Sequence, residues 1–466
     1  MTAKKGRDNM NIDDAEKLSY KRTDINIEYP ELKDRIFDYC EGYKSFIDCS
    51  KTEREAVSFA VKYATGHGFV PYEKGRRYEG GEKVYYVNRD KSIFLAVIGE
   101  ESLSDGCSIV VAHTDSPRLD LKQIPLYEDS GLSYFRTHYY GGIKKYQWTA
   151  VPLALHGVVF TGENKRVDIS IGEDQADPVF YISDLMPHIS KEQMGKKMSE
   201  GITGEGLKII NGSLSYDCEE GTKLYVLSLL YEKYGIKEEN LITAELAAVP
   251  AIKSRDVGFD RSMIAAYGQD DRVCAYPALK AICGLSKIKK TAVAMFADKE
   301  EIGSEGVTGL KSSSFKDWLT DLCRMQDVDF SDCCRNSLCF SADVGGAFDP
   351  SFSEAFEKSN SALLNRGVVV TKYTGSRGKS GSSDASAELI FRVSDLLDKN
   401  EVVWQTGEYG KVDQGGAGTV ATEIAGLNIE VIDVGVPLLS MHAPIELAAK
   451  ADIYMMHKAC FALYNR

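Results

Sequence analysis

The chain has 466 residues, a length that predicts two or three domains of about 100 to 200 residues each. Its composition, 43% hydrophobic and 27% charged, is that of a globular protein and excludes disordered, collagen-like and coiled-coil proteins. Lys and Arg total 56 against 69 Asp and Glu, and the net charge of -13 disfavours nucleic acid and membrane surfaces as partners, because both are themselves negatively charged.

The cysteines and the polar N-terminal stretch bear on the compartment. The chain has 11 cysteines without any C-x-x-C spacing, which favours reduced structural thiols over a disulfide framework or a zinc finger. The first thirty residues lack the apolar stretch of a secretory signal, and no apolar run approaches the roughly 20 residues that cross a bilayer. We therefore expect a cytoplasmic protein.

In chain order, helical and strand patterns come first. Apolar residues recur at helical intervals over residues 31–66 and predict one long helix. Two β-prone runs, residues 83–90 and 92–100, predict a hairpin. Residues 107–117 form a short apolar run bounded by polar residues, as is typical of a strand buried on both faces of a sheet. The apolar part of this segment ends at His113.

The pattern changes over residues 121–254, where short β-prone pieces alternate with turn signals. These pieces are residues 147–162, 166–172, 178–185, 222–235 and 241–253. They predict an inserted, mostly β domain.

Strands and helices alternate again from residue 255 to the end. Helices are predicted over residues 269–285 and 382–398, with strand patterns before, between and after them. Such alternation predicts an α/β fold with a mixed, largely parallel sheet flanked by helices. The catalytic domain would then be discontinuous, comprising residues 1–120 and 255–466 on either side of the inserted β-rich domain.

Side chains that carry chemistry follow these patterns at five places. They are His113 and His442, the pair Glu300 and Glu301, Asp343, and Asp270 with Asp271 at the start of a helix. Because ligands bind at the carboxyl ends of the strands in open α/β sheets, we expect these segments, up to about 330 positions apart, to meet in one crevice. Each residue taken singly could also be merely packed or solvated.

Together these residues favour a metal-dependent hydrolase. Two imidazoles with several carboxylates suit Zn²⁺ and also Mn²⁺ or Co²⁺, and the surplus of carboxylates suits two ions that share a bridging group. Of the neighbours Glu300 and Glu301, one would be a ligand and the other a general base. Asp115, two residues after His113, could orient its imidazole ring.

Several motifs resemble those of one known family. They are AHTDSP (112–117), QDDRVCA (269–275), DKEEIGSEG (298–306), SADV (341–344) and SMHAPIEL (440–447). In this order they resemble the aspartyl aminopeptidase and vacuolar aminopeptidase I family of dinuclear zinc exopeptidases. Residues 139–148 and 178–190 are similar to the inserted dimerisation domain of that family, so the resemblance covers nearly the whole chain.

The resemblance implies two Zn²⁺ ions per subunit that share one ligand. Carried over by motif, the ligands are His113, Asp270 and Asp343 for one ion, and Asp270, Glu301 and His442 for the other. Asp270 would bridge the two ions.

The resemblance also implies roles outside the ligand set. Glu300 would be the general base, and Asp115 would fix the ring of His113. His188, in the inserted domain, would reach the active site of a neighbouring subunit and bind substrate there. The family assembles as tetrahedral dodecamers built from dimers, so we expect a homo-oligomer that removes the N-terminal residue from short peptides.

Departures from the family pattern leave the specificity open. Gly345, Gly346 and Asp349 stand where aspartyl aminopeptidases carry histidines, and Asp271 stands where they have Asn. A neutral or basic first residue of the substrate is therefore a hypothesis beside an acidic one. Two alternatives to the aminopeptidase are a related co-catalytic metal amidase or carboxypeptidase, and a non-catalytic assembly or cargo protein on the same fold.

Overall fold

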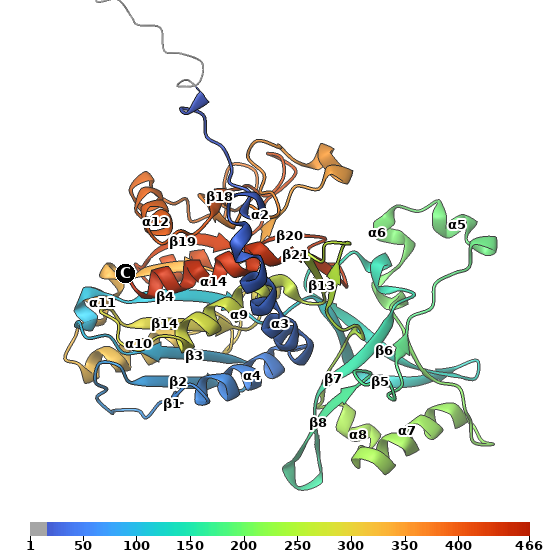
Figure 1. The fold of residues 1–466 in the computed structure, drawn as a ribbon. Helices are drawn as coiled ribbons and strands as arrows, with labels where there is room; N and C mark the ends of the chain where they lie inside the picture. The colour runs from blue at the N-terminus through green and yellow to red at the C-terminus, as the bar shows by residue number, and fades with distance from the viewer. Residues whose placement is uncertain (1–15) are drawn as a thin grey trace, which may run out of the picture.

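A computed structural model describes residues 16–466. The chain forms a large α/β body and a smaller β-rich part that extends to one side of it (Figure 1). We expected no secretory signal in the first thirty residues. Residues 1–15, the first half of that stretch, lie outside the described residues. Among the described residues, no helix is long and apolar enough to cross a membrane.

The α/β body is built on a nine-stranded sheet. In the order in which they pair, its strands are β1 (Val70–Pro71), β2 (Lys83–Asn88), β3 (Ser92–Val97), β14 (Ala292–Ala297), β4 (Ser108–His113), β15 (Leu338–Ser341), β19 (Glu430–Gly435), β17 (Val368–Thr371) and β18 (Trp404–Thr406). The four central strands, β14, β4, β15 and β19, run parallel, whereas β3 and β17 pair antiparallel to the strands beside them at the centre. The predicted mixed, largely parallel sheet is confirmed, as is the hairpin of β2 and β3.

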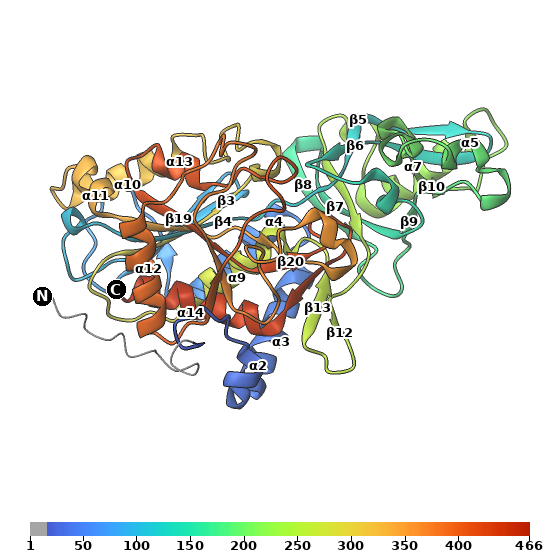
Figure 2. The ribbon, with the colours of Figure 1, turned by 90° about the horizontal axis from the view of Figure 1, so that it is seen from above.

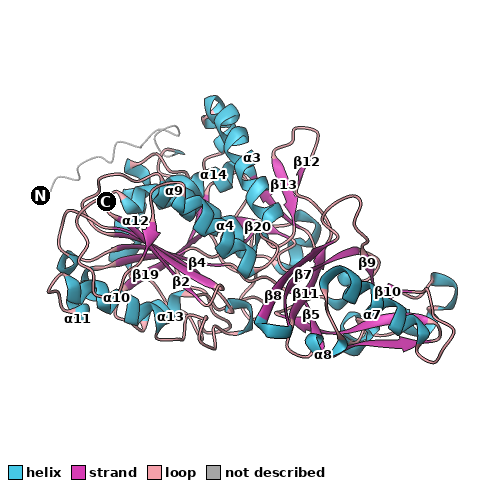
Figure 3. Cartoon of the chain, turned by 90° about the horizontal axis from the view of Figure 1, so that it is seen from below, coloured by secondary structure: helices cyan, strands magenta, loops and turns pink. Residues whose placement is uncertain are grey.

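Helices cover both faces of this sheet (Figures 2 and 3). One face packs against α3 (Lys33–Cys49), α4 (Glu53–Thr65), α9 (Gln269–Cys283), α12 (Ala387–Lys399) and α14 (Lys450–Tyr464). The other packs against α10 (Ser314–Met325), α11 (Phe330–Asn336), α13 (Ala421–Ala425) and the short η2 (Leu103–Asp105). The central strands are buried on both sides, which explains their continuous apolar sequences.

The prediction of a single helix over residues 31–66 is wrong in one respect, because the structure has two helices there, α3 and α4. Thr52 caps α4: its side chain accepts a hydrogen bond from the Glu55 amide, and the Glu55 carboxylate accepts one from the Thr52 amide. Such a capping box starts a new helix. The apolar periodicity continues across the break because both helices pack on the same core.

The β-rich part contains a seven-stranded sheet. Its strands are β11 (Glu245–Pro250), β5 (Arg118–Asp129), β6 (Leu132–Tyr140), β10 (Ile209–Gly212), β9 (Phe180–Tyr181), β7 (Pro152–Thr161) and β8 (Lys165–Ile171). Strand β11 pairs with both β5 and β7, so the sheet closes on itself. The division of the chain at residues 121 and 254 stays a prediction.

Helices and turns complete the β-rich part. They are α5 (Lys191–Met194), α6 (Met198–Gly201), α7 (Gly221–Tyr234), α8 (Glu238–Leu241), η3 (Lys145–Trp148), η4 (Gly162–Asn164), η5 (Pro187–Ile189) and η6 (Gly204–Gly206). The β-prone interpretation of residues 222–235 is wrong, since this segment is α7. Val226, Leu230 and Tyr234 recur at helical spacing and pack against the core of the β-rich part, and this spacing outweighs the β propensity of the individual residues.

A small five-stranded sheet lies between the two parts, where β13 and β20 appear in both Figure 1 and Figure 2. Its strands pair in the order β12 (Arg255–Val257), β13 (Met263–Ala266), β21 (Glu446–Ala449), β20 (Pro437–Leu439) and β16 (Gly345–Gly346). The remaining short elements are α2 (Ile25–Glu28), η1 (Pro30–Leu32), η7 (Glu300–Ile302) and η8 (Pro350–Ala355). This sheet places the loop between β20 and β21 beside the start of α9, because β21 pairs with β13 just before that helix.

Gly435, at the end of β19, is packed so closely that no side chain fits. A Cβ atom there would lie 1.6 Å from the carbonyl oxygen of Asp343. We expect Gly435→Ala to cost about 1 to 3 kcal/mol, because the backbone after β15 must move. Gly418→Ala is the matched control, since a Cβ at Gly418 would have no atom within 4 Å. A midpoint of thermal unfolding that is equal in the two variants would contradict this expectation.

Candidate metal centre

Three neighbouring parallel strands deliver the candidate site residues to one edge of the nine-stranded sheet. His113 is the last residue of β4, Asp343 follows β15, and Glu300 with Glu301 begins η7 after β14. Parallel strands present their carboxyl ends at the same edge of a sheet, which is why residues far apart in the sequence meet here. The start of α9 contributes a carboxylate, Asp270, and the loop between β20 and β21 a histidine, His442.

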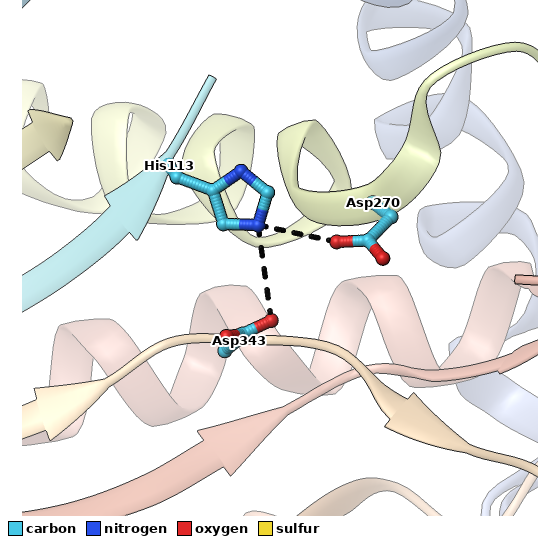
Figure 4. A group of neighbouring side chains, drawn as sticks. All are labelled: His113, Asp270 and Asp343. Atoms are coloured by element: carbon cyan, nitrogen blue, oxygen red, sulfur yellow. Dashed lines mark ion pairs between the residues drawn. The ribbon is translucent and has the colours of Figure 1, made fainter. Parts of the chain in front are cut away.

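These side chains form two groups that share Asp270. One group is His113, Asp270 and Asp343, and the other is Asp270, Glu301 and His442; in each, the potential ligand atoms lie within 4.8 Å of one another. Asp270 Oδ1 is 3.2 Å from His113 Nε2, and Asp270 Oδ2 is 3.1 Å from His442 Nε2. Asp343 Oδ1 lies 3.9 Å from the same nitrogen, His113 Nε2, in a different direction from Asp270 (Figure 4).

Backbone carbonyls select the same tautomer of both histidines. His113 Nδ1 is 3.0 Å from the carbonyl oxygen of Asp115, and His442 Nδ1 is 2.8 Å from that of Gly142. A carbonyl oxygen only accepts hydrogen bonds, so each Nδ1 carries a proton and donates it. Nε2 therefore faces Asp270: it donates a hydrogen bond to this carboxylate when the ring is protonated, and it offers a lone pair to a metal ion when the ring is neutral, as a metal-ligating histidine does.

Asp115 connects His113 with the segment that carries the two glutamates. Its carboxylate is fully buried, and it accepts hydrogen bonds from the backbone amides of Glu300 and Glu301, each at 3.2 Å. Its Oδ1 also lies 3.4 Å from His113 Nδ1. Burial raises the pKa of Asp115, but the contacts with His113 and Tyr140 outweigh it and lower the pKa below its ordinary value. Asp115 is therefore an ionised acceptor.

Two site residues, Glu446 and Tyr140, were missed from the sequence. The buried Glu446 carboxylate accepts hydrogen bonds from the amides of Asp270 at 3.1 Å and His442 at 2.8 Å. Tyr140, at the end of β6, donates from its hydroxyl to Asp115 Oδ2 at 2.8 Å. Glu446 lies inside the motif at residues 440–447, which could have drawn attention to it; Tyr140 lies on a strand of the other part of the molecule, and only its position in the similar segment 139–148 marked it.

The electrostatics of the centre are dominated by crowded carboxylates. Burial and the charge of Asp270 raise the pKa of Glu300 and Glu301, and burial with the charges of Asp271 and Glu300 raises the pKa of Asp343. Burial raises the pKa of Asp270 in turn, but its hydrogen bonds with both histidines hold that pKa well below the usual range.

The histidines show the reverse balance. Burial lowers the pKa of His442, but the hydrogen bond with Asp270 and the charge of Glu301 outweigh it and raise the pKa to about 10. Burial likewise opposes the protonated form of His113, and hydrogen bonds with Asp115 and Asp270 hold its pKa well above the ordinary value. Because the pKa values of these histidines and of Glu300, Glu301 and Asp343 are all raised, the centre favours additional positive charge.

The donor set fits divalent metal ions. It offers two oriented imidazole nitrogens and several carboxylates, a combination that suits Zn²⁺. The buried Glu301 Oε1 has no hydrogen-bond partner, although an unpartnered buried carboxylate oxygen is costly. A cation held by the Asp270, Glu301 and His442 group would satisfy this atom.

His188 is the one predicted site residue that lies elsewhere. It belongs to the exposed turn η5 of the β-rich part and is a member of neither ligand group. The role we expected for it concerns a neighbouring subunit and stays a prediction.

The sequence and fold match known proteins over nearly the whole chain. The family model described as aminopeptidase I zinc metalloprotease (M18) matches residues 46–464. A Clostridium acetobutylicum protein named probable M18 family aminopeptidase 1 is 46% identical over 457 residues, which cover 96% of this chain and 98% of that protein. The crystal structure of an M18 family aminopeptidase from Thermotoga maritima has a TM-score of 0.92 at 40% identity, covering 96% of this chain and 100% of that one.

A more distant solved structure shares the fold. The S. cerevisiae mApe1 dodecamer is 19% identical, with a TM-score of 0.75 over 92% of this chain and 96% of that chain. Because the matched family and the nearer relatives are aminopeptidases, neither an amidase or carboxypeptidase nor a non-catalytic assembly protein is favoured. The chain belongs to the M18 family of zinc metalloaminopeptidases.

Proposed function

We propose that this enzyme removes the N-terminal residue of short peptides at a dinuclear centre that binds two Zn²⁺ ions per subunit, with Mn²⁺ or Co²⁺ as substitutes. His113, Asp270 and Asp343 would hold one ion, and Asp270, Glu301 and His442 the other. The observation that carries the proposal is the shared carboxylate: the two oxygens of Asp270 face different histidines, at 3.2 and 3.1 Å.

Glu300 is the general base in this proposal. Bound divalent ions would make a water more acidic and polarise the scissile carbonyl. Glu300 belongs to neither ligand group, and its side chain is 20% exposed where that of Glu301 is 4% exposed. Its raised pKa, caused by burial and by Asp270, suits a group that takes a proton from water and returns it to the leaving amine.

Metal removal tests the metal dependence and the end of the peptide that is recognised. We expect a chelator to abolish release of the first residue from dipeptides and tripeptides, and Zn²⁺, Mn²⁺ or Co²⁺ to restore it. Peptides with an acetylated N-terminus should not be cleaved, because the free α-amino group is what the enzyme recognises. A panel with acidic, neutral and basic first residues ranks the specificity in the same assay.

The chelator experiment has two outcomes that would contradict the proposal. Cleavage of acetylated peptides would move the assignment to an amidase or carboxypeptidase. Full activity in the metal-free protein would remove the metal centre from the mechanism.

Neighbouring glutamates provide a matched pair of variants. Glu300→Gln should lower kcat by about 10²- to 10⁴-fold and leave the metal content unchanged, because it removes the base but no ligand. Glu301→Gln changes the next residue in the same way but should lower the metal content, measured by elemental analysis of the purified protein. Near-normal turnover of a fully metallated Glu300→Gln variant would refute the assignment of the base.

A homo-oligomer is the proposed form of the enzyme, a tetrahedral dodecamer built from dimers that join through the β-rich part. Exposed large apolar side chains concentrate in one stretch of that part: Val179, Tyr181, Leu185, Met186, Ile189, Met194, Met198, Leu214, Tyr216, Leu224, Leu229 and Tyr231. Such side chains are typical of surfaces that a partner covers. The dodecamer formed by yeast mApe1, which shares the fold, supports the same conclusion.

In this assembly His188 would reach the neighbouring subunit's substrate. We expect His188→Ala to lower kcat/KM while the metal content and the oligomer, measured by sizing chromatography, stay as in the wild type. His67→Ala is the control, because His67 is also exposed but lies next to α4 in the α/β body. Equal kcat/KM in the two variants would exclude the role of His188.

The cytoplasm is the proposed location. All 11 cysteines are free, and nine of them are buried. The cysteines of the described residues thus form no disulfide, and free thiols are typical of proteins in a reducing compartment.

A further inference from the structure

The β-rich part reaches the metal centre at one point. Strand β6 ends at Tyr140, and the chain then turns through Gly141 and Gly142 directly beside the candidate ligands. We call these three residues the 140–142 turn. Tyr140 contacts Asp115, Gly142 contacts His442, and Gly141 lies beside Glu301.

The first contact of the turn acts on Asp115. Tyr140 donates a hydrogen bond to Asp115 Oδ2 at 2.8 Å, the same oxygen that accepts the Glu301 amide at 3.2 Å. Asp115 Oδ1 accepts the Glu300 amide and faces His113 Nδ1. Without the Tyr140 hydroxyl, the buried Asp115 carboxylate would keep only its contacts with the two backbone amides and His113, and its orientation would be less firmly fixed. The orientation of His113 would loosen with it.

Tyr140 is itself held in place. The guanidinium carbon of Arg118 lies 4.0 Å from the centre of the Tyr140 ring, which is a cation–π contact. Arg118 is in turn fixed by hydrogen bonds to Glu53 at 3.0 Å and to Asp120 at 2.7 Å. The ring thus stands against a charged group that is anchored to both parts of the molecule, since Glu53 begins α4 and Asp120 lies in β5.

The second contact of the turn acts on the other ligand group. The carbonyl oxygen of Gly142 accepts the hydrogen bond from His442 Nδ1 at 2.8 Å and so leaves Nε2 facing Asp270. Gly141 has a φ of +73°, and a Cβ there would lie 3.1 Å from Glu301 Oε2. The turn therefore packs against one candidate ligand of this group and hydrogen-bonds another.

We propose that the 140–142 turn is a positioning element of the metal centre, supplied by the β-rich part and acting on both ligand groups. Tyr140 is a positioning residue, because it acts through Asp115, which is not itself one of the candidate ligands. The inference rests on the proposed metal-dependent function. Contacts that orient ligands in this way are typically worth about 10- to 100-fold in metal affinity or activity.

The test compares two adjacent tyrosines. Tyr140→Phe removes only the hydroxyl, and we expect about 10-fold weaker Zn²⁺ binding, measured by competition with a chromophoric chelator, and a lower kcat with nearly unchanged KM. Tyr139→Phe makes the same change at a side chain that is 41% exposed and should match the wild type in both measurements. Gly141→Ala is the second variant and should also weaken Zn²⁺ binding, because its methyl group meets Glu301.

Each outcome decides between the inference and the function on which it rests. Wild-type Zn²⁺ affinity and kcat in Tyr140→Phe would overturn the role of Tyr140. A lower midpoint of thermal unfolding with unchanged Zn²⁺ affinity would overturn it too, because that result marks a purely structural residue. Wild-type affinity in Gly141→Ala would overturn the action on the second ligand group. A wild-type protein that binds no Zn²⁺ would overturn the proposed function itself.

Discussion

The candidate centre depends on one carboxylate, that of Asp270, placed between two imidazoles. Its two oxygens lie 3.2 and 3.1 Å from different histidines, so a shift of this side chain would disturb both ligand groups at once. Its backbone is held by Glu446, which accepts the Asp270 amide with one oxygen and the His442 amide with the other. One buried glutamate thus fixes the backbone of Asp270 relative to that of His442, and both residues follow strands of the five-stranded sheet.

The buried charges of the centre are stabilised by specific hydrogen-bond and charge partners. An isolated carboxylate in a protein interior is strongly unfavourable, and it is tolerated when hydrogen bonds or opposite charges surround it. Asp115 receives two backbone amides and a tyrosine hydroxyl, whereas Glu301 Oε1 receives none. This difference marks Asp115 as a support that the protein itself satisfies, and Glu301 Oε1 as an oxygen that a cation could satisfy.

Prediction from the sequence succeeded where a local pattern and its position were sufficient. Buried strand patterns located His113, and the rule that carboxyl ends of parallel strands meet brought it together with Asp343 and Glu301. Prediction failed where a pattern had two solutions: the apolar residues of α7 satisfy both β propensity and helical spacing, and only packing against the β-rich core decides between them. The break at Thr52 was missed for a related reason, because the apolar periodicity runs through it.

The supporting residues were harder to predict than the candidate ligands for a physical reason. A ligand must be one of a few residue types, but a supporting contact needs only a donor or acceptor in the right place, and a tyrosine hydroxyl or a glycine carbonyl serves as well as a carboxylate. The position of Tyr140 comes from the fold: β6 pairs with β5 up to its last residue, where Tyr140 lies opposite Arg118, so the end of the strand is fixed by pairing and not by a free loop. The strand that Arg118 fixes in this ladder therefore ends in the tyrosine whose hydroxyl reaches Asp115.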